Sequence, residues 1–305
     1  MYDTIRIQLK HTATQHQTLL TLLYSLGKVD ERKNGISQTV TYYVKYRYWQ
    51  FTLTPTYLYC TGSLPQLLYG TNLVNFTISD TRLAINELNK ILKVDISDAK
   101  VTRIDFAYNF LMTYPVSTYF KVLCHKSYCK VNTFGAETLT FKGSNEEFTF
   151  YDKIAQLKSK GENISNEYSD KHLLRYEMKL TESISKKLGY DVITVADLIS
   201  EDFYQVVKEH WYTSYQLIDK LSYDIPDYGN NVSEFKDYLM LRGIDEIGLS
   251  TLFNDVDTVF KSKTKAKNRI KTMLRKLTAN REKLIANIAL AELDEKMLSI
   301  IEMAS

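Results

Sequence analysis

Three segments of the chain alternate strictly between polar and apolar residues, and this alternation constrains the fold more than any other feature. The segments are "TRIDFAYN" (102–109), "EFTFYDK" (147–153) and "LRYEMKL" (174–180). Because successive side chains of a β-strand point to opposite faces, each segment predicts a strand with one apolar face and one face of ionisable groups. Strands of this kind are typical of an antiparallel sheet with helices packed on one face and the other face open.

The rest of the sequence predicts an α+β unit followed by an all-α region. Further strands are expected at 2–9, 39–54, 56–62 and 138–143, because these segments are rich in β-branched and aromatic residues. Helices are expected after Asp80, as the N-cap of 81–92, and from Pro115 over 115–125. From about residue 192 the apolar period becomes helical. We therefore predict an α+β unit over 1–185 and a helical region over 190–305, with the clearest linker at 223–231.

Composition limits the class of protein. No apolar run reaches the roughly 18 residues of a membrane span, and the N-terminus lacks the apolar core of a signal peptide. Three cysteines do not make a disulfide framework, which fits a reducing compartment. These features predict a cytoplasmic globular protein with no membrane partner.

Positive charge is concentrated near the C-terminal end. The formal net charge is only +3, but residues 261–283 carry ten Lys or Arg residues and one Glu. A basic helix of this kind favours contact with nucleic-acid phosphates, and binding to a membrane surface is the competing interpretation. The 23 tyrosines could stack on unpaired bases, although a tyrosine-rich sheet also explains them.

The polar faces of the three alternating segments carry a candidate catalytic site. They present Arg103 and Asp105 from the first segment, Tyr151 and Lys153 from the second, and Arg175, Glu177 and Lys179 from the third. An ordinary solvated sheet face is the simpler explanation. Two carboxylates from different strands could instead hold a hard cation such as Mg²⁺ or Mn²⁺. A cation near Tyr151 would favour its phenolate, which is the form that attacks phosphorus.

Four motifs in a fixed order connect this pattern to a known family. "GSLPQLLYGTN" (62–72), "VTRIDFAYNF" (101–110), the pair "TLTFKG" and "FTFYDK", and "LLRYEMKL" (173–180) resemble the rolling-circle replication initiators of filamentous phages, the gene II/X protein family. They are similar, more distantly, to the trans-acting initiators of rolling-circle plasmids. The resemblance covers roughly residues 1–185.

The resemblance implies an activity and roles for particular residues. It implies a nuclease-like sheet and an enzyme that nicks one strand of the origin, forms a 5′-phosphotyrosine and a 3′-OH primer, and later rejoins the displaced strand. Tyr151 matches the nucleophile, with Lys153 beside it, and Asp105 and Glu177 match the ligands of Mg²⁺ or Mn²⁺. Arg103, Lys153 and Arg175 match phosphate-positioning groups. Further phosphate or DNA contacts are assigned from their positive charge to Lys179 on the same polar face and to six residues of the basic segment, Lys263, Lys267, Arg269, Lys271, Arg275 and Lys276.

The same resemblance implies partners and a location. The partners would be the double-stranded origin, single-stranded DNA, and a host helicase and polymerase, in the cytoplasm of a bacterial cell. The chain departs from many rolling-circle initiators because none of its five histidines forms a His-hydrophobe-His pair. Glu146 or Glu147 is therefore a candidate third ligand, and no second nucleophile can be assigned.

Other interpretations stay open at the level of sequence. A metal nuclease without a covalent intermediate would use the same carboxylates, with Tyr151 only stacking a base. A non-catalytic DNA-binding replication protein would have an ordinary polar sheet face. Cys124, His125 and Cys129 match no common zinc pattern, and "DEIGLSTLFNDV" (245–256) could belong to a helix-turn-helix.

Overall fold

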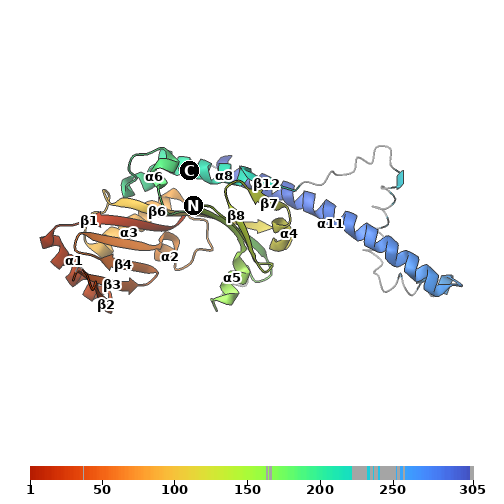
Figure 1. Ribbon diagram of the computed structural model, residues 1–305, viewed down its shortest axis with the longest axis horizontal. Helices are drawn as coiled ribbons and strands as arrows, with labels where there is room; N and C mark the ends of the chain where they lie inside the picture. The colour runs from red at the N-terminus through yellow and green to blue at the C-terminus, as the bar shows by residue number, and fades with distance from the viewer. Residues whose placement is uncertain are drawn as a thin grey trace.

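The fold is taken from a computed structural model, in which one large antiparallel sheet dominates the molecule (Figure 1). The structure describes residues 1–221 except 37, 163, 165 and 166, scattered positions between 232 and 259, and residues 260–302, with the side chains of 274–287 left out. The predicted linker at 223–231 and the predicted helix-turn-helix lie almost entirely outside the described residues. No helix within the described part of the chain is both long and apolar enough to cross a lipid bilayer.

The main sheet has ten strands in the order β2-β3-β4-β5-β1-β6-β11-β10-β9-β8, and every neighbouring pair is antiparallel. Its strands are β1 (Tyr2–Lys10), β2 (Val29–Lys33), β3 (Val40–Tyr46), β4 (Trp49–Leu53), β5 (Tyr57–Ser63), β6 (Lys100–Met112), β8 (Lys130–Phe134), β9 (Thr138–Lys142), β10 (Glu146–Asp152) and β11 (His172–Leu180). A small second sheet pairs β7 (Leu123–Lys126) with β12 (Ile218–Lys220).

The described helices are α1 (Ala13–Leu26), α2 (Leu64–Tyr69), α3 (Ile78–Leu92), α4 (Val116–Phe120), α5 (Lys153–Ser159), α6 (Ile184–Leu188), α7 (Val195–Leu198), α8 (Glu201–Gln216) and α11 (Lys263–Glu302). Aromatic residues join α8 to the apolar face of the sheet. The Tyr176 ring stacks on Phe150 with centroids 4.3 Å apart, and it meets Trp211 of α8 at 4.8 Å. The predicted α+β architecture is therefore confirmed.

The last part of α11 belongs to the same core. Ala289, Leu293 and Met297 are buried, and the helix packs against α4 and α8. The Tyr215 hydroxyl donates to the Asp294 carboxylate at 2.6 Å, which ties the helix to α8. The first part of α11 projects away from the sheet as a long rod (Figure 1). The division of the chain into two domains near residue 185 stays a prediction. In the structure, α8 and the end of α11 share the core of the sheet.

Two details of the predicted helices are wrong. Thr77, not Asp80, caps α3: the Thr77 hydroxyl accepts from the Asp80 N–H, and the Asp80 carboxylate accepts from the Thr77 N–H. This reciprocal capping box places Asp80 inside the first turn. The helix after Pro115 ends at Phe120, and the residues that follow form β7, because their backbone pairs with β12.

One glycine in β5 is required by close packing. Gly62 lies under Trp49, and a Cβ atom at this position would come within 2.3–2.6 Å of the indole ring. Trp49 is buried and pairs with Gly62 across the two strands. The missing side chain is what allows the indole to lie flat on the sheet.

Gly62→Ala should therefore destabilise the protein by about 1–3 kcal/mol through overpacking. Urea denaturation followed by circular dichroism measures the change. Gly35→Ala is the matched control, because an added Cβ there meets no atom within 4 Å. An equal loss of stability in the two variants would contradict this account.

Candidate functional site

The strand register brings the sequence-predicted residues together on one face of the sheet. Tyr151 of β10 lies opposite Arg175 of β11, which lies opposite Asn109 of β6. In the next row on this face Thr149 lies opposite Glu177, and in the row beyond it Lys179 lies opposite both Glu147 and Asp105. Directly paired residues of an antiparallel sheet share a face. The polar face expected from alternation therefore exists, with Tyr151, Glu177 and Asp105 on it.

Arg175 is the centre of this face. Its side chain is fully buried, and its guanidinium forms an ion pair with the Asp3 carboxylate of β1. It also donates to Asn109 Oδ1 at 3.1 Å, to Glu177 Oε2 at 3.3 Å and to the Asn72 backbone oxygen at 3.3 Å. A buried cation needs partners of this kind, because removing it from water costs several kcal/mol. Arg175 thus fixes β1, β6, β11 and the loop after α2 relative to one another.

The Tyr151 hydroxyl donates to Glu177 Oε2 at 3.1 Å. The tyrosine is 7% exposed. Burial, followed by the negative charge of Glu177, raises the pKa of the Tyr151 phenol well above its usual value. Arg175 lowers the pKa of this phenol, as expected of a neighbouring cation, but the effect of burial is larger. The phenol is therefore neutral, and the Glu177 side chain accepts its hydrogen bond.

Arg103 and Asp105 form a bidentate pair beside Glu177. Arg103 Nε donates to Asp105 Oδ1 at 2.8 Å, and a second guanidinium nitrogen pairs with Oδ2. Asp105 is buried, while about a quarter of the Arg103 side chain is exposed. Burial raises the pKa of the Asp105 carboxyl to about 6 despite Arg103, and the charge of Glu177 adds to this.

Lys153 lies beside Tyr151, but it belongs to a helix and not to the predicted strand. β10 ends at Asp152, whose side chain caps α5 by accepting from the N–H groups of Ile154 and Ala155. Lys153 is therefore the first residue of a helix and not the next member of the strand face. Its buried ammonium donates to Gln156 Oε1 at 2.8 Å and lies 5.9 Å from the centre of the Tyr151 ring. Burial, and then Arg175, lower the pKa of Lys153 to about 8.

Asp3 also belongs to this face, although it was not predicted from the sequence. Besides Arg175, the Asp3 carboxylate accepts from the Ser63 hydroxyl at 2.7 Å and from Asn72 Nδ2 at 3.3 Å. Burial opposes the ionisation of Asp3, but Arg175 and Ser63 outweigh it and hold the pKa of this carboxyl below its usual value. The pairing of β1 with β6 shifts between Tyr2 and Ile5, so simple alternation in "YDTIRIQL" could not place Asp3 on this face. Its motif neighbours Ser63 and Asn72 were the available signal.

The remaining predicted residues lie in different surroundings. Lys179 is half-buried on the polar face. Glu146 lies on the opposite, helix-covered face of the sheet, where the Lys187 ammonium donates to it at 2.5 Å. It is therefore not placed to be a third ligand beside Tyr151. Glu147 pairs with Lys142 at 3.6 Å. Within the described residues, no group of three or more His, Cys, Asp or Glu side chains is arranged to hold a metal. Cys124, His125 and Cys129 therefore form no such group either.

The basic segment forms the projecting part of α11. Lys263, Arg269 and Lys271 are exposed there, and Lys267 is half-buried. Arg275 and Lys276 lie in the same helix, but their side chains are outside the described set.

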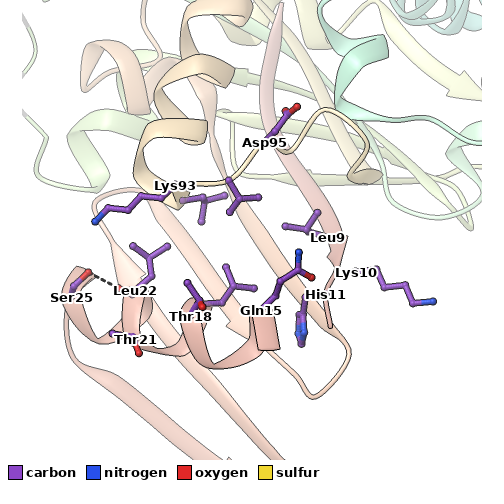
Figure 2. Close-up of a pocket in the computed structure, with 13 residues that line it drawn as sticks. Leu9, Lys10, His11, Gln15, Thr18, Thr21, Leu22, Ser25, Lys93 and Asp95 are labelled. Carbon is purple, nitrogen blue, oxygen red and sulfur yellow. Dashed lines mark hydrogen bonds between the residues drawn. The ribbon is translucent and has the colours of Figure 1, made fainter. Parts of the chain in front are cut away.

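A separate cleft of about 710 Å³ lies between α1 and the end of α3 (Figure 2). His11, Gln15, Thr18, Lys93 and Asp95 are among the side chains that line it. None of the sequence-predicted site residues contributes to it, so it is not the candidate site.

One face of the sheet carries a tyrosine hydrogen-bonded to a carboxylate, and a basic helix projects from the same body (Figure 1). Residues 1–210 match the family model for the N-terminal region of the phage replication-associated protein of the gene II type. The match spans more than half of the chain, so the chain belongs to this phage family, and the resemblance to the gene II initiators is confirmed. A search of curated proteins found no match.

Breaking the buried ion pair should cost much more stability than breaking an exposed one. Asp3→Ala leaves Arg175 charged and unpaired in the interior, and about 3–5 kcal/mol should be lost. Glu201→Ala is the control, because Glu201 pairs with Arg82 at 3.1 Å on the surface and should contribute at most about 1 kcal/mol. Urea titrations of both variants test this, and similar losses would contradict a central role for Arg175.

Asp105 should make stability depend on pH in a specific window. Its folded pKa of about 6 lies above the unfolded value of about 3.9, so its protonated form favours folding. This contribution is complete below about pH 4 and is lost as pH rises through about 6, up to about 3 kcal/mol. Asp105→Asn should remove this part of the pH dependence in unfolding titrations between about pH 4 and 7. An unchanged slope would contradict the raised pKa.

Proposed function

We propose that this protein initiates rolling-circle DNA replication by nicking one strand of its origin with Tyr151. The product would be a 5′-phosphotyrosine and a free 3′-OH that primes synthesis, and a second cut would later rejoin the displaced strand. The observation that carries the proposal is the contact of the Tyr151 hydroxyl with Glu177 on the polar face. Membership of the replication-associated family supports the setting.

The proposed step follows from the protonation states of the site. Tyr151 Oη attacks the phosphorus atom, its proton passes to Glu177, and the bond from phosphorus to the 3′-oxygen breaks. Glu177 is in hydrogen-bond contact with this proton already, which a neutral phenol requires. The leaving 3′-oxygen needs a proton, and Lys153 can donate one because its pKa near 8 keeps it mostly protonated at neutral pH.

Asp105 and Glu177 would hold the Mg²⁺ or Mn²⁺ ion that the resemblance implies. Their oxygens are of the type that hard cations prefer, they lie on adjacent strands, and the charge of Glu177 contributes to the raised pKa of Asp105. Arg103, Arg175 and Tyr151 contact these two carboxylates, so binding would have to displace some of these contacts. When bound, such an ion would polarise a phosphoryl oxygen and stabilise charge in the transition state.

The arginines on the polar face would have different roles. Arg175 has no exposed surface and contacts Asp3, Asn109 and Glu177, so we assign it to positioning Glu177 rather than to binding phosphate. Arg103 is partly exposed at the edge of the site and, with Lys179, is better placed to meet a phosphate. The partners would be the double-stranded origin, single-stranded DNA, and a host helicase and polymerase in the bacterial cytoplasm.

Burial of Tyr151 favours one alternative. A metal-dependent nuclease that attacks with water would use Asp105 and Glu177 in the same way and would leave the phenol neutral throughout. The two functions differ in whether protein remains attached to the cut DNA.

Tyr151→Phe should abolish the covalent DNA–protein product, because the attacking oxygen is gone, while DNA binding is retained. The full-length protein would be incubated with Mn²⁺ and supercoiled DNA of its own replicon, and the products separated on a denaturing protein gel. Tyr48→Phe is the matched control, since Tyr48 is exposed in the turn between β3 and β4. Nicked DNA without attached protein would point to the hydrolytic nuclease.

The basic part of α11 should contribute electrostatic affinity for duplex DNA. Replacing Lys263, Arg269 and Lys271 together by Gln should reduce the slope of log affinity against log salt by about 0.9 for each phosphate that these side chains neutralise. Lys90→Gln is the control, because Lys90 is exposed on α3 far along the chain from α11, and it should leave the slope unchanged. Fluorescence anisotropy over a salt series measures both, and equal slopes would contradict a DNA contact by α11.

A further inference from the structure

The polar face of the sheet continues well beyond the catalytic residues, across the strands on the N-terminal side. One row of directly paired residues runs from β6 to β3 through Arg103, Arg6, Thr61, Gln50 and Lys45. The next row runs from β6 to β2 through Lys100, Gln8, Tyr59, Thr52, Tyr43 and Asp30. Helix α1 packs on the other side of these strands, where Val44 and Phe51 are buried. We call the two rows the tyrosine platform.

The tyrosine platform has the surface chemistry of a nucleic-acid site. Its two tyrosines, Tyr43 and Tyr59, are half-buried, so part of each ring is accessible. Each is flanked by a guanidinium: Arg6 lies 4.9 Å from the Tyr59 ring centre, and Arg32 lies 4.9 Å from that of Tyr43. Arg6, Arg32 and Lys45 are exposed. An aromatic ring can stack an unpaired base, while the adjacent cation meets the phosphate of the same strand.

The charge and position of the platform indicate which partner it takes. Its two rows contain four cations, Arg103, Arg6, Lys45 and Lys100, and one acid, Asp30. From β6 to β3 it spans about 19 Å, at about 4.8 Å for each of four strand intervals. One end is Arg103, whose guanidinium contacts Asp105 of the catalytic site.

We propose that the tyrosine platform binds single-stranded DNA and leads that strand to Tyr151. Bases would stack on Tyr59 and Tyr43, and phosphates would be held by Arg6, Arg32 and Lys45. Duplex DNA does not fit this chemistry, because paired bases offer no free face to a tyrosine ring. The direction toward Tyr151 rests on the proposed function, whereas binding of the strand can be measured without cleavage.

The test measures binding of the full-length protein in EDTA, by anisotropy, to a fluorescent oligothymidine of about 20 nucleotides, which exceeds a typical single site. A duplex of the same length is measured in parallel. Tyr43→Ala with Tyr59→Ala should weaken binding to the single strand by about 10-fold or more, with little change for the duplex. Tyr43→Phe with Tyr59→Phe should retain binding, since phenylalanine also stacks.

Tyr24→Ala is the matched control, because Tyr24 is 53% exposed on α1, on the opposite side of the sheet. Wild-type affinity of the doubly alanine-substituted protein for the single strand would overturn the proposal. If that protein fails to fold, Arg6→Gln with Lys45→Gln should lower the salt slope by about 0.7 for each phosphate of a single strand that these side chains neutralise. An unchanged slope would equally overturn it.

The outcome is separable from that of the proposed function. Binding of the oligothymidine is measured in EDTA without cleavage, so it does not depend on whether Tyr151 attacks DNA. If the wild type forms no covalent product, but the platform substitutions weaken binding of the oligothymidine, tyrosine-linked nicking is rejected and the platform is supported. If the covalent product forms, but the platform substitutions leave binding unchanged, only the platform is rejected.

Discussion

The buried ion pair between Arg175 and Asp3 is the interaction on which the arrangement of the polar face depends. It joins β11 to β1 across β6, and the same guanidinium contacts Asn109 and Glu177. A fully buried cation tolerates few alternative positions for its partners, because moving any one of them away leaves charge uncompensated in a medium of low polarity. Glu177 is therefore held where it meets the Tyr151 hydroxyl, and the geometry of the proposed chemistry follows from a constraint of folding.

The two faces of the main sheet differ in chemistry, since one is apolar and covered by helices and the other is polar. Aromatic residues such as Tyr176 and Trp211 fill the face under α8 and α11, and this core gives rigid support to the candidate site on the other face. The opposite face carries ionisable residues near β10 and β11 and tyrosines with arginines toward β2. In the proposed function, the strand that is cut would lie along this open face. The first part of α11, which carries the basic residues, projects away from the body (Figure 1) and would meet duplex DNA.

Alternation in the sequence was enough to predict β6, β10 and β11 and the polar face of each, because strand parity is a local property. Grouping Tyr151, Asp105 and Glu177 in one site also needed the family resemblance, because parity does not say which strands are neighbours. Alternation could not predict Asp3, since a shift in the pairing of β1 with β6 breaks parity there. It also misjudged Lys153, because the cap formed by Asp152 ends the strand one residue earlier. The high pKa of Tyr151 was beyond sequence reasoning, as burial depends on α5 and on neighbouring strands that come together only in the folded chain.

The proposed function requires that Tyr151, held against Glu177, forms a bond to DNA. The most direct measurement is mass spectrometry of peptides from protein that has reacted with its own origin DNA and Mn²⁺, after nuclease digestion of the DNA. We expect a nucleotide phosphate attached to Tyr151 in the peptide that contains "FTFYDK". A nucleotide attached to a different tyrosine, or origin DNA that is nicked with no modified peptide, would contradict it.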